Sequence, residues 1–326
     1  MRALVHENGS LQMKEMELQE PGGSEVVISL KAAGLNRRDL GIPNRRKGTD
    51  KALILGSDGA GIVEKVGRNV TDVKVGDEVI INPALRWVKN NEAPPVEFDI
   101  LGMPDHGTFA EKIVISEDQV EPKPSFMSWE EAAAFPLAAL TGYRAMFTKG
   151  QLQKGETVFI PGAGGGVATY LIAFAKNIGA RVITTSRSAE KREKAVKLGA
   201  DVVIDTADDW KERLGNETID MVIDSNGKAT FSRSLTILKK GGRFVTFGAT
   251  TDDIVEFDLR SFFYGQYKLI GSTMGCREEL IAALEHAEQY QLHPVVDRVF
   301  SLDQSLDAFS YLDGGKQFGK VIIRIS

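Results

Sequence analysis

Apolar residues follow two different patterns along the 326-residue chain. In the first third, short runs of β-forming residues are broken by glycine, which is typical of a compact β-barrel. From Thr157 onward, strand-like runs alternate with helical segments, and this alternation predicts a parallel sheet with helices on both faces. The runs of the first kind are residues 25–32, 61–66, 77–81 and 111–115, and those of the second kind are residues 157–160, 181–185, 202–204, 219–224, 243–247 and 268–272.

The same patterns divide the chain into three segments that we expect to form two domains of an α/β protein. Residues 126–270 carry the doubly wound parallel sheet, and residues 1–125 carry the barrel. The sixth strand of the sheet is complete by Ser272. The last segment, residues 271–326, ends in a further strand, so we expect it to return to the first domain.

A glycine-rich turn follows the first strand of the predicted parallel sheet. A pyrophosphate can approach backbone N–H groups only where side chains are absent, and the start of the next helix supplies partial positive charge. The turn therefore predicts a dinucleotide site, although such turns also occur as plain strand-to-helix corners. Its candidate binding residues are Gly162, Gly164, Gly165, Gly166 and Val167, followed by Ala168 at the close helix contact.

The end of the second strand indicates which dinucleotide binds. An acidic residue there binds the ribose hydroxyls of NAD, whereas this chain has Ser186 and then Arg187. A guanidinium can bind a 2′-phosphate through two hydrogen bonds, and Lys191 adds a second positive charge. We therefore expect NADP(H); the alternative is that both basic residues form a solvated surface pair.

Other strand ends of the sheet contribute further candidates. Ligands of open α/β sheets lie at the carboxyl ends of the strands, where Gly248, Ser272 and Thr273 are expected to flank the nicotinamide. Each of the three is equally compatible with an ordinary turn. The aromatic residues at 262–264 and 267 are better suited to core or dimer-interface packing than to a substrate cage.

Bulk composition excludes several classes of partner. The net charge is −5 and no basic block is present, so we expect no nucleic acid partner. The apolar stretches are too short to span a bilayer and the first residues lack a signal-peptide core, which predicts a cytoplasmic protein without a membrane partner. Cys276 is the single cysteine, so the chain can form no internal disulfide and no zinc site built on several thiolates.

Several motifs together give the chain a family resemblance. Residues 56–67 (GSDGAGIVEKVG) and 75–79 (VGDEV) resemble the signature of the medium-chain dehydrogenase/reductase superfamily, and the likeness continues to the closing Gly319-Lys320-Val321. The resemblance implies a GroES-like catalytic domain split around a Rossmann domain, with the active site in the cleft between them. It also implies a homodimer or tetramer formed by pairing edge strands, here residues 268–272.

The resemblance also shows where this chain departs from the zinc alcohol dehydrogenases. Motif alignment places their catalytic zinc ligands at Asn36, at Ser57 with Asp58, and at Leu137, and their structural zinc lobe within residues 83–106. One carboxylate cannot hold zinc, and the lobe contains no cysteine, so we expect no metal. His106 is expected to be a solvated loop side chain. These replacements are similar to the zinc-independent quinone oxidoreductase and enone reductase branch.

Loss of the metal limits the expected chemistry. Without a Lewis acid, an unactivated ketone has nothing to hold charge on its oxygen during hydride transfer. Addition of hydride to a quinone, enal or enone spreads that charge over a conjugated system. We therefore expect an NADPH-dependent reductase of a small electrophilic carbonyl compound. The alternatives are direct reduction of simple aldehydes or ketones, and an NADPH-binding sensor without turnover.

The resemblance supplies the candidate catalytic residues. They are Asn36, whose amide is expected to donate to a substrate oxygen or hold the nicotinamide ribose, Asp58, and Thr141, which is expected to contact the nicotinamide. Arg37 matches a position that reaches the cofactor pyrophosphate in some relatives. Arg38 falls where zinc dehydrogenases often have a hydroxyl for proton relay. Alternatively, Asn36 closes a turn, and Asp58 and Asp39 orient these arginines through ion pairs.

Overall fold

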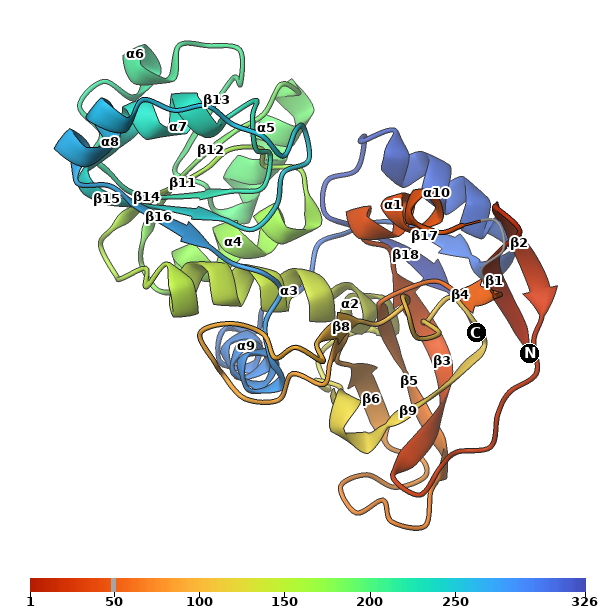
Figure 1. Cartoon of the computed structure of the whole chain (residues 1–326). Coiled ribbons are helices and arrows are strands. Elements are labelled where there is room, and N and C mark those ends of the chain that lie inside the picture. Colours follow the sequence, from red (N-terminus) through yellow and green to blue (C-terminus); the bar gives the residue numbers. More distant parts are fainter. Residues whose placement is uncertain (48–50) are drawn as a thin grey trace. The chain divides into compact units, whose positions relative to one another are not determined.

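The computed structural model describes residues 1–47 and 51–326, which form two compact units (Figure 1). Unit 1 comprises residues 1–140 and 275–326, and unit 2 comprises residues 141–274. The sequence placed the changes of domain at 125/126 and 270/271. At the first boundary unit 1 extends further than expected, because helix α2, Trp129–Ala134, packs on strands β3 and β5 of that unit. At the second boundary unit 2 extends further, to Met274. No helix in the described part of the chain is long and apolar enough to cross a membrane.

Unit 1 is built mainly from antiparallel strands. A small sheet has the order β2-β1-β4, and a larger one has the order β10-β6-β5-β3-β18-β17, with β9 also pairing with β3. The elements are β1 Arg2–Glu7, β2 Ser10–Glu15, β3 Glu25–Gly34, α1 Arg37–Arg45, β4 Leu53–Ile54, β5 Asp58–Val66, β6 Glu78–Ile81, β7 Ala84–Leu85, β8 Asp99–Ile100, β9 Lys112–Ser116, η1 Glu117–Gln119, β10 Val120–Pro122, α2, α3 Pro136–Tyr143, α9 Arg277–Tyr290, β17 Val296–Ser301, η3 Leu302–Gln304, α10 Ser305–Asp313 and β18 Lys320–Arg324. The chain passes into unit 2 within α3.

The centre of the larger sheet brings together residues from both ends of the chain. Strand β3 lies between β5 and β18, with Gly34 opposite Asp58 on one side and opposite Ile322 on the other. A Cβ at Gly34 would collide with the carbonyl oxygen of Ala133, so glycine allows α2 to pack closely here. The carboxyl end of β3, the start of β5 and the start of β18 therefore meet at one point.

Unit 2 is a doubly wound sheet of six parallel strands in the order β13-β12-β11-β14-β15-β16. Its elements are η2 Arg144–Lys149, β11 Thr157–Ile160, α4 Gly166–Asn177, β12 Arg181–Thr185, α5 Ala189–Leu198, β13 Val202–Ile204, α6 Trp210–Leu214, β14 Ile219–Asp224, α7 Phe231–Ile237, β15 Leu238–Thr246, α8 Leu259–Gly265 and β16 Lys268–Gly271. Strand β11 is buried along its whole length, as expected when helices cover both faces of a sheet. The α/β fold class expected from the sequence is confirmed.

Candidate active site

Asn36 lies between β3 and α1, and its side chain is held in one orientation. Its Oδ1 accepts a hydrogen bond from Nζ of Lys320 at 2.6 Å, and its Nδ2 donates to Oδ2 of Asp58 at 2.9 Å. An ammonium can only donate and a carboxylate can only accept, so these two partners determine which end of the amide is oxygen. The Asn36 side chain is thus buried and positioned by a cation on one side and an anion on the other.

Asp58 begins β5 and uses both carboxylate oxygens. Oδ2 accepts from Lys320 Nζ at 2.8 Å as well as from Asn36, while Oδ1 accepts from the backbone N–H of Leu137 at 2.7 Å. The side chains of Lys320 and Asp58 are 3% and 0% exposed. Asp58 therefore forms its ion pair with Lys320. The sequence had left open an ion pair with Arg37 or Arg38, and the structure, which describes both arginines, shows neither.

We call the side chains of Lys320, Asp58 and Asn36 the buried network. Two of them, Asn36 and Asp58, occupy positions that motif alignment matches to the zinc ligands of zinc dehydrogenases. Zinc normally takes three protein ligands of thiolate, imidazole or carboxylate type. Here one amide and one carboxylate are both bonded to an ammonium, which would repel a second cation. Among residues 1–47 and 51–326, no three His, Cys, Asp or Glu side chains form a group that could hold a metal ion. The residues present do not fit zinc.

Ser57, which also aligns with a zinc-ligand position, binds the side chain of Arg38. Its hydroxyl donates to the carbonyl oxygen of Leu101 at 2.8 Å and accepts from Nη1 of Arg38 at 2.6 Å. The same Nη1 donates to Leu101 O at 2.9 Å. Burial lowers the pKa of Arg38, but a guanidinium keeps its charge at neutral pH. An aligned zinc-ligand position thus holds a cationic side chain in place in this chain.

Asp39 completes this group of charges in the first turn of α1. Its Oδ2 accepts from the backbone N–H of Asn36 at 2.8 Å and so caps the helix. Its Oδ1 lies 3.9 Å from Arg38 Nη1 and accepts no hydrogen bond in the described part of the chain. Burial raises the pKa of Asp39 to about 6, since the nearby Arg38 only partly offsets the loss of hydration.

The glycine turn of unit 2 joins β11 to α4 as expected from the sequence. Gly162 has a φ of 91°, which favours glycine, and its N–H donates to Thr185 Oγ1 at 3.2 Å. Gly165 is the residue before α4, and a Cβ there would meet no atom within 4 Å. The start of this 12-residue helix is therefore open to an anionic group. The structure brings together in this turn Gly162, Gly164, Gly165, Gly166 and Val167.

The residues after β12 fit a further phosphate. Ser186 is buried, and its hydroxyl accepts from the backbone N–H of Ser188 at 3.2 Å. Arg187 is exposed and forms no hydrogen bond or ion pair within the described residues. Lys191 lies in the first turn of α5, where its backbone N–H donates to Ser188 Oγ. A guanidinium without a protein partner is available to an anionic ligand.

The sequence prediction missed two basic residues. Arg192 donates from Nη1 to Ser186 O and to Asp205 Oδ2, both at 2.7 Å, and so fixes the loop after β12. Lys320 belongs to the closing motif Gly319-Lys320-Val321, from which no role for it was predicted. Lys320 has no local signal in the sequence, because it is 284 positions from Asn36 and only folding brings the two together. Arg192 is only six positions from Ser186, but its contact depends on how the chain turns after β12.

The remaining candidate residues for cofactor binding lie in helices α1 and α3 and after strands β15 and β16. Arg37 is the exposed first residue of α1, and Thr141 is buried in α3. Gly248 follows β15, and Ser272 and Thr273 follow β16, where the N–H of Ser272 donates to Thr246 O at 2.8 Å. The strand ends that carry the last three are therefore neighbours, as the sequence predicts for a parallel sheet.

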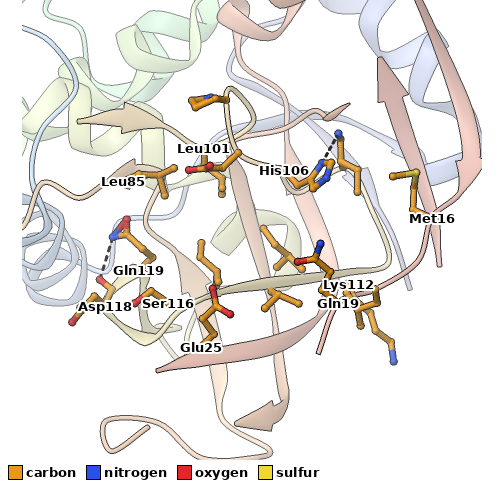
Figure 2. Close-up of a pocket in the computed structure, with 18 of the residues that line it drawn as sticks. Met16, Gln19, Glu25, Leu85, Leu101, His106, Lys112, Ser116, Asp118 and Gln119 are labelled. Atoms are coloured by element: carbon orange, nitrogen blue, oxygen red, sulfur yellow. Dashed lines mark hydrogen bonds between the residues drawn. The ribbon is translucent and has the colours of Figure 1, made fainter. Parts of the chain in front are cut away.

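His106 belongs to a separate cavity of unit 1, with a volume of about 580 Å³ (Figure 2). Its Nδ1 accepts from the backbone N–H of Ile54 at 3.1 Å, so the neutral ring carries its hydrogen on Nε2. His106 is exposed as a residue, as the sequence predicts, but partial burial of its ring lowers the pKa of His106, so the ring is neutral at physiological pH. The residues that line this cavity do not include any member of the buried network.

Two family models match the chain, one within unit 1 and one that covers most of unit 2 and continues into α9 of unit 1. The family described as alcohol dehydrogenase GroES-like domain matches residues 22–125, and the family described as zinc-binding dehydrogenase matches residues 166–289. The zinc-type alcohol dehydrogenase-like protein YogA of Leptosphaeria maculans is 31% identical over 97% of this chain and 94% of its own length. The 2-methylene-furan-3-one reductase of Solanum lycopersicum is 33% identical over 92% of this chain and 71% of its own length.

Solved structures share the fold of the whole chain. A crystal structure named NAD-dependent alcohol dehydrogenase is 33% identical, with a TM-score of 0.91 and complete coverage of both chains. The 2-octenoyl-CoA carboxylase reductase CinF, solved with NADP and 2-octenoyl-CoA, is 27% identical, with a TM-score of 0.87 over 99% of this chain and 87% of its own. The relatives therefore include proteins named for either nicotinamide cofactor.

Proposed function

The chain belongs to the medium-chain dehydrogenase/reductase superfamily, and from this premise we propose that it is a zinc-independent, NADPH-dependent reductase of small electrophilic carbonyl compounds. The observation that carries the proposal is the buried network of Lys320, Asp58 and Asn36. It fills matched metal-ligand positions with groups that bond to one another. The oxidoreductase therefore works without zinc, on acceptors that need no Lewis acid.

Unit 2 holds the cofactor. Its pyrophosphate lies against the glycine turn at the start of α4, and its adenosine 2′-phosphate is bound by Arg187 together with the hydroxyl of Ser186. The unpaired guanidinium of Arg187 and the absence of an acidic residue at the end of β12 support NADP(H) over NAD(H). The NADP complex of CinF supports the same choice, whereas the similar alcohol dehydrogenase structure is named for NAD. Bound NADPH supplies the hydride.

The substrate class follows from what the site lacks and what relatives reduce. A quinone, enal or enone delocalises the charge that hydride addition creates, so fixed hydrogen-bond donors are sufficient. Names of relatives, such as 2-methylene-furan-3-one reductase and crotonyl-CoA reductase, support a conjugated carbonyl substrate. Thr141 contacts the nicotinamide in this proposal. Asp58 and Lys320 act by positioning, because both oxygens of Asp58 already accept hydrogen bonds.

Within the buried network, one amide hydrogen of Asn36 is still available to donate a hydrogen bond to a ligand. One hydrogen of Nδ2 is donated to Asp58, and the other has only a long contact of 3.5 Å to Gly34 O. Asn36 thus contributes a single positioned donor to a substrate oxygen or to the nicotinamide ribose. Arg37, exposed at the start of α1, is assigned to the cofactor pyrophosphate.

We further propose a homo-oligomer in which unit 2 pairs with a second copy. Strand β16 is at one edge of the six-stranded sheet, and edge strands present unpaired backbone groups. Leu259, Phe263 and Tyr264 of α8 and Leu269 of β16 are large apolar side chains exposed close to that edge. An exposed apolar patch beside an open edge is typical of an interaction surface.

The function is tested by following NADPH oxidation through its absorbance with a panel of acceptors. We expect turnover with quinones, enals or enones, lower activity with NADH, and no loss after prolonged dialysis against a strong chelator. Metal analysis of the active protein should give far less than one zinc per chain. NADPH binding without oxidation of any acceptor would instead indicate a sensor, and chelator-sensitive alcohol oxidation would refute the zinc-free mechanism.

A further inference from the structure

Arg38 has donors that the fold does not use. Both hydrogens of its Nη1 are donated, one to Ser57 Oγ at 2.6 Å and one to Leu101 O at 2.9 Å. The Nε and Nη2 donors bond to no group within residues 1–47 and 51–326, and neither is among the unpartnered polar atoms that are sealed from solvent. The side chain as a whole is only 16% exposed. The guanidinium is therefore anchored on one nitrogen and open along its Nε–Nη2 edge.

Two oxygen atoms hold Nη1 of Arg38, and these two oxygens are hydrogen-bonded to each other. Ser57 donates its hydroxyl hydrogen to the carbonyl oxygen of Leu101, which also accepts from Nη1 of Arg38. The Ser57 hydroxyl oxygen is then left to accept the second hydrogen of Nη1. A guanidinium is planar, so fixing one nitrogen fixes the direction of the other two. Three N–H donors are thereby aimed in a set direction without a protein acceptor. Preorganised donors of this kind are the main way in which enzymes stabilise developing negative charge.

The charge of Arg38 is not neutralised by a close contact. Its nearest carboxylate oxygen, Asp39 Oδ1, is 3.9 Å from the anchored Nη1, beyond hydrogen-bond distance. Asp58 is already paired with Lys320 at 2.8 Å. The open edge therefore has no carboxylate of the described residues hydrogen-bonded to it, and because the side chain is only 16% exposed, an oxyanion interacts with it more strongly than in bulk solvent.

We propose that the Nε–Nη2 edge of Arg38 binds the carbonyl oxygen of the hydride acceptor and stabilises the enolate that forms, in the role a metal ion has in zinc dehydrogenases. This inference rests on the proposed function. A hydride from the dihydronicotinamide, with both its electrons, forms a new C–H bond at the β-carbon of the enone. The C=C electron pair moves to the Cα–C bond, the carbonyl π pair moves to oxygen, and the oxidised cofactor remains. A proton from water then adds to the α-carbon and restores the carbonyl.

Substitution of Arg38 separates this role from a structural one. We expect Arg38→Met to lower kcat for a neutral enone by about 100- to 1,000-fold, the usual loss for one oxyanion-stabilising group. The KM for NADPH should be unchanged, and Arg38→Lys should recover part of kcat because it restores the charge without the fork. Added guanidinium or ethylguanidinium should partly rescue the methionine variant. Arg68→Met, which removes an exposed arginine from the loop after β5 of the same unit, is the matched control and should leave kcat unchanged.

A second measurement does not depend on turnover, and its first part needs only the wild-type protein. A ring-substituted nitrophenol series is titrated into the wild-type protein with NADP⁺ bound, because a phenolate imitates the enolate oxygen. We expect the ionised phenol to bind at least roughly 10-fold more tightly than the neutral phenol, seen as growth of phenolate absorbance on binding, and we expect Arg38→Met to abolish this preference.

Several outcomes would overturn the role of Arg38. They are equal affinity for phenol and phenolate, the absence of any phenolate binding, an Arg38→Met variant with normal kcat, and a loss confined to acceptors that carry a carboxylate, which would make Arg38 a specificity residue. Failure of the proposed function looks different: no acceptor in the panel would be reduced, while the phenolate titration would still report on Arg38.

Discussion

The ammonium of Lys320 lies 2.8 Å from Oδ2 of Asp58, and both side chains are almost completely buried. Two charges removed from water are tolerated only where their geometry is close and their remaining hydrogen-bonding groups are satisfied. Asp58 meets that condition through Leu137 and Asn36, and Lys320 also bonds to Asn36. The pair ties the last strand of the chain to the start of β5 at the point where the site is assembled.

Removing one member of the Lys320–Asp58 pair should lower the stability of the folded protein. We expect Lys320→Met to lower the free energy of unfolding by about 3–5 kcal/mol, because Asp58 would remain buried without a counter-charge. The double variant Asp58→Asn with Lys320→Met should recover a large part of that loss. Urea denaturation measures both. Lys65→Met, which removes a solvent-exposed partner of Glu20, is the control and should change stability by less than about 1 kcal/mol. A loss equally small for Lys320→Met would show that the pair is unimportant.

The sequence was sufficient for the fold of unit 2 and for its glycine turn. Strand runs such as 157–160 and 181–185 alternate with helices, and alternation of this kind leaves few chain topologies. The Gly162 turn could be recognised because its requirement is local: a backbone approached by a phosphate has no room for side chains. Local requirements of this kind are visible in one segment of sequence.

The buried network was only half visible in the sequence. Motif alignment identified Asn36 and Asp58 as replacements for metal ligands, because they lie within recognisable motifs. It did not identify the cation, because Lys320 reaches Asn36 only through the pairing of β18 with β3. The anchoring of Arg38 Nη1 was not predicted for the same reason, since Leu101 is 63 positions away and lies in another loop. Side-chain partners set by long-range strand pairing cannot be derived from spacing.

Arg187 should determine the preference for NADPH. We expect Arg187→Gln to lower kcat/KM for NADPH by roughly 10- to 100-fold, since hydrogen bonds to a charged group contribute about 1.5–3 kcal/mol. The value for NADH should be almost unchanged, because NADH has no 2′-phosphate. Steady-state kinetics with both cofactors measure the ratio.

Arg181→Gln is the control for that experiment. Arg181 is at the opposite end of β12, and its guanidinium is already paired with Glu217 at 2.6 Å. It should leave the NADPH/NADH ratio as in the wild type. An Arg187→Gln variant with an unchanged ratio would remove the basis for assigning the 2′-phosphate to this residue.

The exposed edge of unit 2 predicts self-association. We expect a dimer or tetramer by light scattering, and we expect Tyr264→Lys with Leu269→Lys to shift it toward the monomer, because two charges would be placed in an apolar contact. Leu306→Lys, a similarly exposed leucine in α10 of unit 1, should leave the mass unchanged. A wild-type protein that is monomeric at all concentrations would contradict the proposal.

Asp39 should make the free energy of unfolding fall as the pH rises. Burial raises the pKa of Asp39 from its ordinary value of 3.8 to about 6, so the folded protein holds its proton more tightly than the unfolded chain does. The corresponding stabilisation is complete below about pH 4, decreases as the pH rises, and is lost above about pH 6. A shift of this size corresponds to roughly 3 kcal/mol. The charged groups that face Asp39 are Arg38, Lys320 and Asp58.

Asp39→Asn should therefore be more stable than the wild type at pH 8, by up to about 3 kcal/mol, and the difference should vanish near pH 4. The amide keeps an oxygen that can accept the Asn36 backbone hydrogen bond, so the helix cap is retained. Urea midpoints measured from about pH 4 to about pH 8 give the difference curve. Asp303→Asn, at an exposed ion pair with Arg2, controls for the general effect of removing a carboxylate and should give a nearly flat curve. Parallel curves for wild type and Asp39→Asn would mean that Asp39 is ionised throughout, with its charge balanced by Arg38 despite the 3.9 Å separation.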